Sequence, residues 1–189
     1  IVDIGGTQIL MQGGMNPDLP LEWYTDLLKL LRERFPEVHV HAFSPPEIIE
    51  FVNFFDVPGS TLKEQVRWVL IKLQDAGLQS IPGGGGEIFA PAVRDKIGLG
   101  KCNAEVWLTV MHIAHELGMN TSATMMFGHI EGIADRIHHM DLVRTWQDKS
   151  ISDFGLQGGG RYNAFISWPF QPDNSPLGRV KEWFPENTD

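Results

Sequence analysis

Residues 61–87 read TLKEQVRWVLIKLQDAGLQSIPGGGGE. The first part predicts a helix over residues 61–76, because Thr61-Leu62-Lys63-Glu64 is a capping-box pattern and Gly77 is a natural helix end. Residues 78–81 then predict a short apolar strand, which stops in Pro82 and four glycines. A helical pattern resumes over residues 87–97. A strand, a glycine-rich loop and a helix in this order predict a β/α unit.

The same alternation occurs four more times along the chain. We expect further strands over residues 7–11, 38–43, 120–126 and 164–168, and further helices over residues 21–35, 46–55, 103–117 and 132–149. Repeated units of this kind predict an α/β fold, a parallel β/α barrel of the TIM type or part of one, in a single domain over residues 1–189. In such folds the loops that follow the strands build the active site.

Composition excludes several classes of function. A net charge of −9 and a pI near 5.2 argue against a nucleic-acid partner, which requires clustered basic residues. No stretch approaches the roughly 20 apolar residues that span a bilayer, so we expect no membrane partner. The single cysteine, Cys102, permits no intrachain disulfide and suits a reducing cytoplasm. The start at Ile1 shows no signal-peptide pattern and no initiator Met, so we expect a cytoplasmic protein of which this chain is a fragment.

Two of the loops are rich in glycine. Gln12-Gly13-Gly14 follows a strand, where glycines either make a tight turn or let the backbone approach a ligand. The run Gly83-Gly84-Gly85-Gly86 costs backbone entropy, and no Lys-Ser or Lys-Thr follows it, so it is not a P-loop. Glu87 comes next and is either the acidic residue of a first helical turn or a carboxylate that accepts hydrogen bonds from a ribose diol.

Histidines form the next group of candidates. His39, His41 and Phe43 alternate with apolar residues, so on a strand all three face one way, toward either a barrel lumen or a packed layer. His129 follows a strand and a glycine, where it either caps the loop or transfers protons near neutral pH. The histidine spacings, in the pairs His112 with His115 and His138 with His139, do not indicate a zinc site.

The segment after the last strand joins aromatic and amide side chains. Trp168 and Phe170 alternate with prolines and are followed by Gln171. Such groups either bind a planar heterocycle such as adenine or plug the end of the barrel.

Five segments together resemble one enzyme family. They lie in order along nearly the whole chain, at residues 12–20 (QGGMNPDLP), 41–48 (HAFSPPEI), 77–85 (GLQSIPGGG), 123–129 (ATMMFGH) and 168–172 (WPFQP). The family is that of the radical S-adenosylmethionine enzymes of the futalosine route to menaquinone, and the match is best to the cyclic dehypoxanthinyl futalosine synthases. Aminofutalosine synthase and the tyrosine-adding subunit of deazaflavin (FO) synthase are similar.

The resemblance implies two cofactors, S-adenosyl-L-methionine and a [4Fe–4S] cluster, and an electron donor for the cluster. The family binds its cluster through three cysteines spaced CxxxCxxC, ahead of the region that matches here. Since Cys102 is the sole cysteine, the cluster ligands are not in this chain, and we expect a barrel that lacks its N-terminal unit. Residues 150–163 are longer than the family's connection and have no counterpart in the resemblance.

The implied reaction is a radical cyclisation. A 5′-deoxyadenosyl radical takes a hydrogen atom from the nucleoside-like substrate dehypoxanthine futalosine, the substrate radical attacks its own aromatic ring, and a spiro product forms on loss of a proton and an electron. By position, Gln12, Gly13 and Gly14 match the segment that meets the methionine end of the cofactor. Glu87 then meets its ribose, and Trp168 and Phe170 wall its adenine. His41, Thr124 and His129 face the substrate, and His41 or His129 takes the final proton. A different class stays open, in which a chain without a cluster is a nucleoside-binding β/α module or an interaction scaffold.

Overall fold

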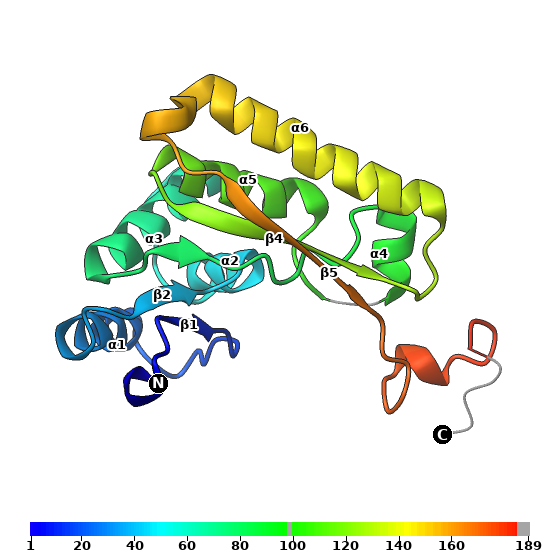
Figure 1. The fold of residues 1–189 in the computed structure, drawn as a ribbon, viewed down its shortest axis with the longest axis horizontal. Helices are drawn as coiled ribbons and strands as arrows, with labels where there is room; N and C mark the ends of the chain where they lie inside the picture. Colours follow the sequence, from blue (N-terminus) through cyan, green and yellow to red (C-terminus); the bar gives the residue numbers. More distant parts are fainter. Residues whose placement is uncertain (98–99, 185–189) are drawn as a thin grey trace.

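The computed structural model describes residues 1–97 and 100–184, and its centre is one parallel β-sheet (Figure 1). The described strands follow the chain order across this sheet, and each neighbouring pair is parallel. They are β1 (Gln8–Met11), β2 (His39–Ala42), β3 (Ser80–Ile81), β4 (Asn120–Phe127) and β5 (Tyr162–Pro169). Parallel strands in chain order need a crossover between each pair, which the helices supply.

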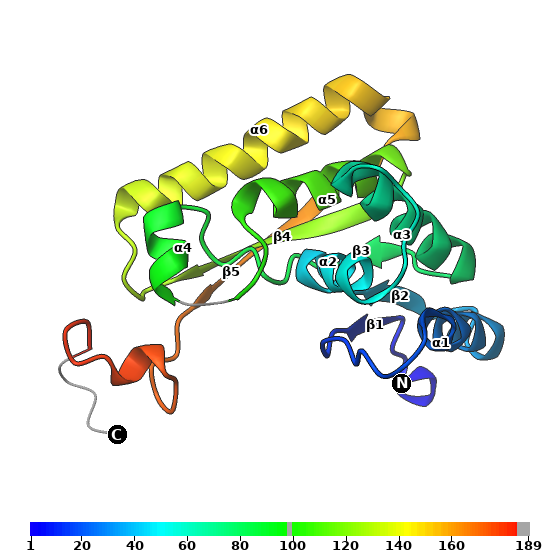
Figure 2. The same cartoon turned by 180° about the vertical axis from the view of Figure 1, so that it is seen from behind.

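The α-helices of the described chain cover the outer face of the curved sheet, as the two opposite views show (Figures 1 and 2). They are α1 (Leu21–Arg34), α2 (Pro45–Phe54), α3 (Leu62–Ala76), α4 (Pro91–Ile97), α5 (Ala104–Glu116) and α6 (Ile133–Gly158). Short 3₁₀ turns lie at Val2–Ile4 and Leu177–Arg179. The architecture is a partial parallel β/α barrel, which confirms the predicted fold class.

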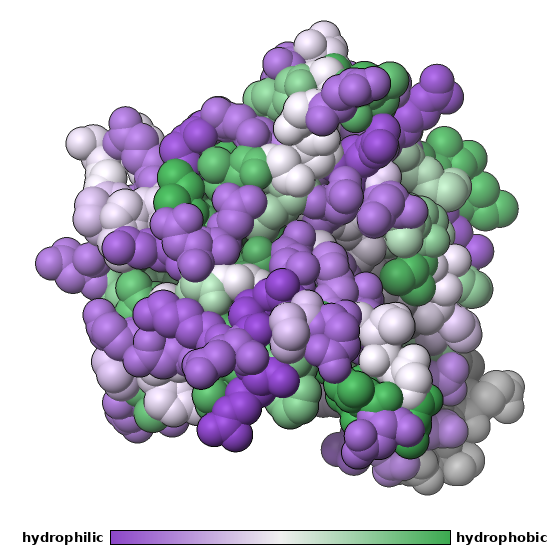
Figure 3. Space-filling view, turned by 60° about the vertical axis from the view of Figure 1, so that its left-hand side comes forward, coloured by the Kyte–Doolittle hydropathy of each residue, from purple (hydrophilic) through white to green (hydrophobic). Residues whose placement is uncertain are grey.

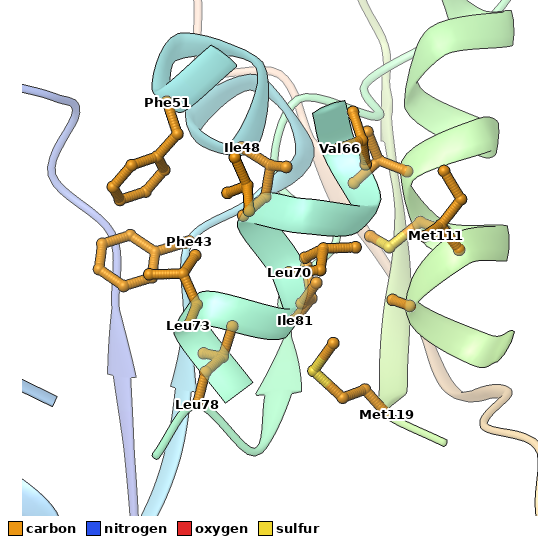
Figure 4. Packing of buried hydrophobic residues seen from close by; sticks show 14 of the residues in the cluster. Phe43, Ile48, Phe51, Val66, Leu70, Leu73, Leu78, Ile81, Met111 and Met119 are labelled. Atoms are coloured by element: carbon orange, nitrogen blue, oxygen red, sulfur yellow. The ribbon is translucent and has the colours of Figure 1, made fainter. Parts of the chain in front are cut away.

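The core lies between the outer face of the sheet and the helices. Helix α3 begins at the expected capping box, in which Thr61 Oγ1 accepts the Glu64 N–H and Glu64 Oε2 accepts the Thr61 N–H. Its apolar side chains recur at helical spacing, so Leu70 and Leu73 are fully buried. Figure 4 shows them near Ile81 of β3, with Met111 of α5 beside them. Burying each such side chain contributes roughly 1.5–3 kcal/mol.

Strand β2 separates a polar inner face from this apolar outer face. Val40 and Ala42 are buried in the core, while His39 and His41 are half-buried on the other side. The expectation that Phe43 shares the side of the histidines is wrong. Its φ of 56° turns the chain after β2, and its ring packs in the core against Phe51, with the ring centroids 5.3 Å apart (Figure 4).

Three boundaries also differ from the prediction. Helix α4 begins at Pro91 and not at Glu87, because Ile88 and Phe89 are buried as an irregular segment of the loop. Glu87 is therefore not a helix-start residue. Helix α6 continues past Lys149 to Gly158, with a non-helical break at Gly155, and so occupies most of the segment that lacked an explanation. Strand β5 begins two residues early because the Gln147 amide binds both the N–H and the carbonyl of Tyr162.

The sheet has two open edges within the described residues. β1 pairs with β2 and β5 pairs with β4, and neither has a second neighbour there. Phe165 and Ile166 of β5 are 43% and 49% exposed. Elsewhere the surface is mixed, and the face in Figure 3 shows mainly hydrophilic residues with apolar residues in small separate groups. Within residues 1–97 and 100–184, no helix combines the length and the apolar character needed to cross a bilayer.

A buried polar network ties α5 to α6 and β4. The His115 ring is fully buried, with Nδ1 2.8 Å from Ser150 Oγ and Nε2 2.8 Å from Thr121 Oγ1. His112 Nδ1 lies 3.0 Å from the same Ser150 oxygen, and its Nε2 lies 3.2 Å from Asp153. Asp153, His112 and Ser150 have the connectivity of a hydrolase triad, but Ser150 is 1% exposed, so its hydroxyl is held from solvent. The network is structural.

We expect acid to destabilise the fold through these buried rings. Burial lowers the pKa of His115 to about 3, with His112 adding to the effect, and burial lowers the pKa of His139 to about 4. Each folded-state pKa is below the unfolded value near 6.5, so the unfolded state binds more protons and stability is lost as pH falls from 6.5 toward the folded pKa. Between pH 7 and pH 5 each ring should cost about 2 kcal/mol of unfolding free energy.

Urea unfolding of the unchanged protein and of His115→Gln at both pH values measures this loss. The variant should be less stable at pH 7 but should lose about 2 kcal/mol less on acidification. His138→Gln changes an exposed histidine on α6 and should keep the acid dependence of the unchanged protein. An unaltered acid dependence in His115→Gln would contradict the role given to this ring.

Candidate active site

The concave side of the sheet holds a cavity of about 510 Å³, called here the lumen cavity. Every described strand contributes inward-facing side chains to it, among them His39 and His41 of β2 and Thr124 of β4. On β5, Ala164, Ile166 and Trp168 line it at alternate positions, which is the period of two that strand geometry requires, and Asn163 lies beside them. The cavity is a barrel interior lined by both polar and apolar side chains.

A second cavity of about 500 Å³, the strand-end pocket, lies where the strands end. Its walls include Gly13 and Gly14 in the loop after β1, Glu47 in the first turn of α2 and Glu87 in the loop after β3. Gln12, Gly84 and Trp168 line both this pocket and the lumen cavity. The two cavities are thus adjacent and share a boundary, so that groups held in one can meet groups held in the other.

Glu47 fixes the first of these loops. Its Oε1 accepts the N–H groups of Gly13 and Gly14, each at 3.1 Å, and its Oε2 accepts both the N–H and the hydroxyl of Ser44 at 2.8 Å. One carboxylate therefore caps α2 and holds the turn after β1. The amides of this turn are therefore already bonded and are not free to bind a ligand.

The run of four glycines packs between neighbouring strand ends. A Cβ on Gly84 would lie 2.2 Å from Gln12 Nε2, and one on Gly85 would lie 2.4 Å from a ring carbon of Pro46. A Cβ on Gly83 would lie 2.7 Å from the Ser122 carbonyl oxygen. The glycines are thus required by close approach as well as by the positive φ of Gly85.

A buried arginine holds this loop in place. Arg94 is 7% exposed, and its guanidinium donates to the carbonyls of Gly85 at 2.8 Å, Gly86 at 3.0 Å and Ile88 at 3.2 Å. Two further N–H groups reach the Cys102 carbonyl, at 2.6 and 3.1 Å. All five guanidinium N–H groups are thereby satisfied by backbone oxygens.

Glu87 is the carboxylate that this loop presents to the strand-end pocket. Its Oε1 pairs with Lys101 Nζ at 2.7 Å, whereas its buried Oε2 has no hydrogen-bond partner in the described chain. An unpaired buried acceptor costs free energy, so its presence at a pocket indicates a missing donor. The φ of 35° at Glu87 is unfavourable for a residue with a side chain. This backbone strain adds a second free-energy cost at the same residue.

The two expected histidines occupy different positions. The His41 ring lines the lumen cavity, and burial together with the neighbouring His39 lowers its pKa below the ordinary value. The His129 ring is fully buried in the loop after β4, with Nε2 3.2 Å from the Met126 carbonyl and Nδ1 3.2 Å from Glu131. Burial lowers the pKa of His129, while Glu131 acts in the opposite direction.

All the other expected residues except Phe170 line one or both of the cavities. Gln12, Gly13, Gly14, Glu87 and Trp168 line the strand-end pocket. Thr124 lines the lumen cavity, with its hydroxyl donating to the Gly83 carbonyl. The Phe170 ring packs at 6.2 Å from the His129 ring and 5.4 Å from that of Phe184, and its N–H donates to the Phe127 carbonyl.

Comparison with known protein families agrees with this geometry. The family model described as the radical SAM superfamily matches residues 1–143. The chain belongs to the radical SAM superfamily.

Relatives within this superfamily cover nearly the whole chain. A cyclic dehypoxanthine futalosine synthase of Halalkalibacterium halodurans is 39% identical over 98% of this chain and 46% of its own length. An aminodeoxyfutalosine synthase of Thermus thermophilus is 42% identical over 93% of this chain and 43% of its own length. An FO synthase of Mycobacterium leprae is 38% identical over 92% of this chain and 18% of its own length. The chain therefore spans less than half the length of these radical SAM relatives.

The residues present fit one of the family's two cofactors. In the described chain no group of three or more histidine, cysteine, aspartate or glutamate side chains could hold a metal. Burial raises the pKa of Cys102 to about 11, which disfavours the thiolate that an iron–sulfur cluster requires. The [4Fe–4S] cluster thus finds no ligands here. S-adenosylmethionine fits the strand-end pocket, since its ribose hydroxyls are donors that suit the unpaired Glu87 oxygen.

Sequence reasoning missed several residues that build the site. Glu47 was within reach, because Ser44-Pro45-Pro46-Glu47 has the spacing of a capping box. Arg94 and Lys101 have no comparable sequence signal. Arg94 bonds the carbonyls of a loop, and Lys101 bonds the carboxylate of Glu87, which lies 14 residues away. Ser80 lies in a strand of two residues, which is too short to show which face its side chain occupies, so the sequence did not identify it as a site residue.

We expect Arg94→Lys to destabilise the fold by about 3 kcal/mol, because a single ammonium cannot reach carbonyls on two sides and leaves buried oxygens unpaired. The free energy of unfolding in urea measures the loss. Arg144→Lys, at an arginine whose side chain is 81% exposed on α6, is the matched control and should change stability by less than about 0.5 kcal/mol. Equal stability of the two variants would show that the Arg94 fork is dispensable.

Proposed function

We propose that the protein containing this chain catalyses the radical S-adenosylmethionine-dependent cyclisation of dehypoxanthine futalosine in menaquinone biosynthesis. One observation supports this most directly: a strand-end pocket with an unpaired buried carboxylate oxygen adjoins a lumen cavity that is lined by a neutral histidine. A cofactor site and a substrate site side by side are what a radical transfer between two nucleosides needs. The match to the cyclic dehypoxanthine futalosine synthase over 98% of the chain supports the choice of substrate.

The strand-end pocket is the proposed cofactor site. Glu87 Oε2 accepts hydrogen bonds from the ribose diol, and the turn at Gln12, Gly13 and Gly14 presents its carbonyl oxygens to the methionine ammonium. Trp168 lies at the boundary of both cavities and walls the adenine, with Phe170 as a more distant support. When bound and cleaved, S-adenosylmethionine supplies the 5′-deoxyadenosyl radical. The cluster and its electron donor lie outside the residues described.

The lumen cavity is the proposed substrate site. Its mixed polar and apolar lining from all the described strands suits a nucleoside-like molecule, and the outer layer of helices excludes water from behind. His41 presents an unbonded Nε2 there and takes the proton that the cyclised ring loses. Thr124 shapes the wall, and His129 supports the loop after β4, with Nε2 bonded to the Met126 carbonyl and Nδ1 buried without a hydrogen-bond partner in the described chain.

Two alternative activities use the same site. The aminodeoxyfutalosine synthase and FO synthase relatives are 42% and 38% identical, so identity does not separate them from the cyclase. The reconstituted full-length protein, supplied with dehypoxanthine futalosine, should form the cyclic product. Formation of aminodeoxyfutalosine or of FO from the corresponding substrates, with no cyclic product, would replace the proposed reaction by one of these.

A nucleoside-binding module without radical chemistry is the alternative from another class. The coding sequence ahead of Ile1 separates the two. A CxxxCxxC motif there supports the enzyme, whereas an intact upstream sequence without it supports the module.

We expect Glu87→Gln to weaken S-adenosylmethionine binding about 10- to 150-fold, because a neutral amide replaces a charge-assisted acceptor worth roughly 1.5–3 kcal/mol. Calorimetry on the reconstituted protein measures the affinity, and thermal unfolding checks that the variant folds. Glu33→Gln removes the same charge from an exposed position on α1 and should leave the affinity unchanged. If Glu87→Gln binds the cofactor as tightly as the control does, the carboxylate has no part in the cofactor site.

We expect His41→Ala to uncouple cofactor cleavage from product formation. Without a base the cyclised radical is not deprotonated, so the ratio of 5′-deoxyadenosine to cyclic product should rise about 100-fold, the lower end for loss of a general base. His129→Ala, whose ring has no open nitrogen toward the cavity, should alter this ratio less. A normal ratio in His41→Ala together with a raised one in His129→Ala would reverse the assignment.

A further inference from the structure

Three side chains on the floor of the lumen cavity form a continuous hydrogen-bonded chain. Ser80 Oγ lies 2.6 Å from His41 Nδ1 and 2.6 Å from His39 Nε2. The sheet register creates this contact, because Ser80 of β3 pairs directly with His41 of β2, and His39 is the next inward residue along that strand. Ser80 is only 6% exposed, so its hydroxyl has little access to a hydrogen-bond partner other than these two rings.

A serine hydroxyl has one proton, which restricts where the other protons lie. Ser80 can donate to one imidazole and must accept from the other. If His41 donates from Nδ1, Ser80 donates to His39 Nε2, and both neutral rings then carry their proton on Nδ1. This arrangement leaves the lone pair of His41 Nε2 facing the lumen cavity, where it has no partner in the described chain.

The surroundings keep this chain neutral and limit it to one added proton. Burial is the main cause that lowers the pKa of both His39 and His41; the Arg32 guanidinium adds to it at His39, and the proximity of His39 adds to it at His41. Arg32 itself bonds to Gln79, whose Oε1 accepts the Val40 N–H between the two histidines. A positive charge on one ring thus disfavours a second charge on the other.

We propose that Ser80 relays a proton from His41 to His39, which makes the three side chains an exit path from the substrate. His41 Nε2 accepts the substrate proton while its Nδ1 proton passes to Ser80 Oγ. The Ser80 hydroxyl proton passes at the same time to His39 Nε2. His39 then holds the charge, about 6–7 Å along β2 from His41, and releases its Nδ1 proton to water. No electron moves, and each group that gains a proton on one side loses one on the other.

The relay separates the proton from the radical reaction. His39 lies at the start of β2, at the end of the lumen cavity opposite to the strand-end pocket. A proton delivered there cannot return readily to the product. The alternative is that Ser80 only anchors the His41 ring, which needs a hydrogen bond but no acceptor for the proton beyond it.

Nitrogen-15 NMR of histidine-labelled protein tests the hydrogen-bond chain without any reaction. At pH 7.5 both rings should show the Nδ1–H tautomer, and in Ser80→Ala both should shift toward the Nε2–H form that a free imidazole favours. Ser80→Thr keeps the hydroxyl and should keep the tautomers of the unchanged protein. Tautomers that do not respond to the loss of the hydroxyl would overturn the proposal.

Turnover by the reconstituted full-length protein tests the direction of transfer, and this part rests on the proposed function. His39→Gln retains an oxygen that accepts from Ser80 but cannot take up a proton, so it keeps the anchor and removes the end of the relay. We expect both His39→Gln and Ser80→Ala to raise the ratio of 5′-deoxyadenosine to cyclic product about tenfold, with Ser80→Thr near the unchanged ratio.

The outcomes are distinct. If Ser80→Ala raises the ratio and His39→Gln does not, Ser80 is an anchor and the relay is excluded. If the unchanged protein makes no cyclic product while the NMR arm shows linked tautomers, the proposed reaction fails and the hydrogen-bonded chain stands.

Discussion

The strand-end pocket depends on one buried cation. The Arg94 guanidinium is removed from water without a carboxylate bonded to it, and burial lowers its pKa as a result. Burying a charge costs several kcal/mol unless other dipoles replace its hydration shell. Here the carbonyls of Gly85, Gly86, Ile88 and Cys102 do so. The glycine run complements this arrangement, because the carbonyls of Gly85 and Gly86 bond the guanidinium. A side chain on Gly85 would collide with Pro46, and one on Gly86 would collide with Thr124.

This constraint positions the groups proposed to bind a cofactor. Arg94 fixes the loop on one side, so Glu87 is held toward Lys101 and keeps one carboxylate oxygen unpaired in the described chain. Gly84 lies at the boundary between the strand-end pocket and the lumen cavity. The Trp107 indole adds a hydrogen bond to the Gly84 carbonyl from the core side, at 3.0 Å. The glycine loop thus carries unfavourable backbone entropy and strain, and hydrogen bonds from both the helix layer and the sheet hold it in place.

Sequence patterns within one helix or strand predicted the fold well, whereas features that depend on contacts formed only in the folded chain were missed. Thr61, Glu64 and Gly77 act within one helix, so their pattern located α3 correctly. The predicted positions of Phe43, on the inner face of β2, and of Glu87, at a helix start, are wrong. Each residue has a positive φ that packing in the folded chain imposes, and this backbone angle interrupts the periodicity on which the prediction depends. Helix α6 was ended early because the hydrogen bonds that fix its far end join Ser150 to His112 and His115, more than 30 residues away. At the site, glycines and aromatics in loops were recognisable by type. Arg94 and Ser80 were not, since Arg94 bonds the carbonyls of an irregular loop that has no sequence pattern, and Ser80 bonds histidines that only the sheet brings near.

Cys102 gives the Arg94 arrangement a further consequence. Its carbonyl is an anchor for two of the guanidinium bonds, while its thiol is protected from ionisation by burial. Thiol reagents attack the thiolate, so the side chain becomes reactive chiefly when the surrounding loop moves away and water enters. As the one sulfhydryl in the sequence, it is a native chemical reporter for local opening of the glycine loop, distinct from unfolding of the whole barrel.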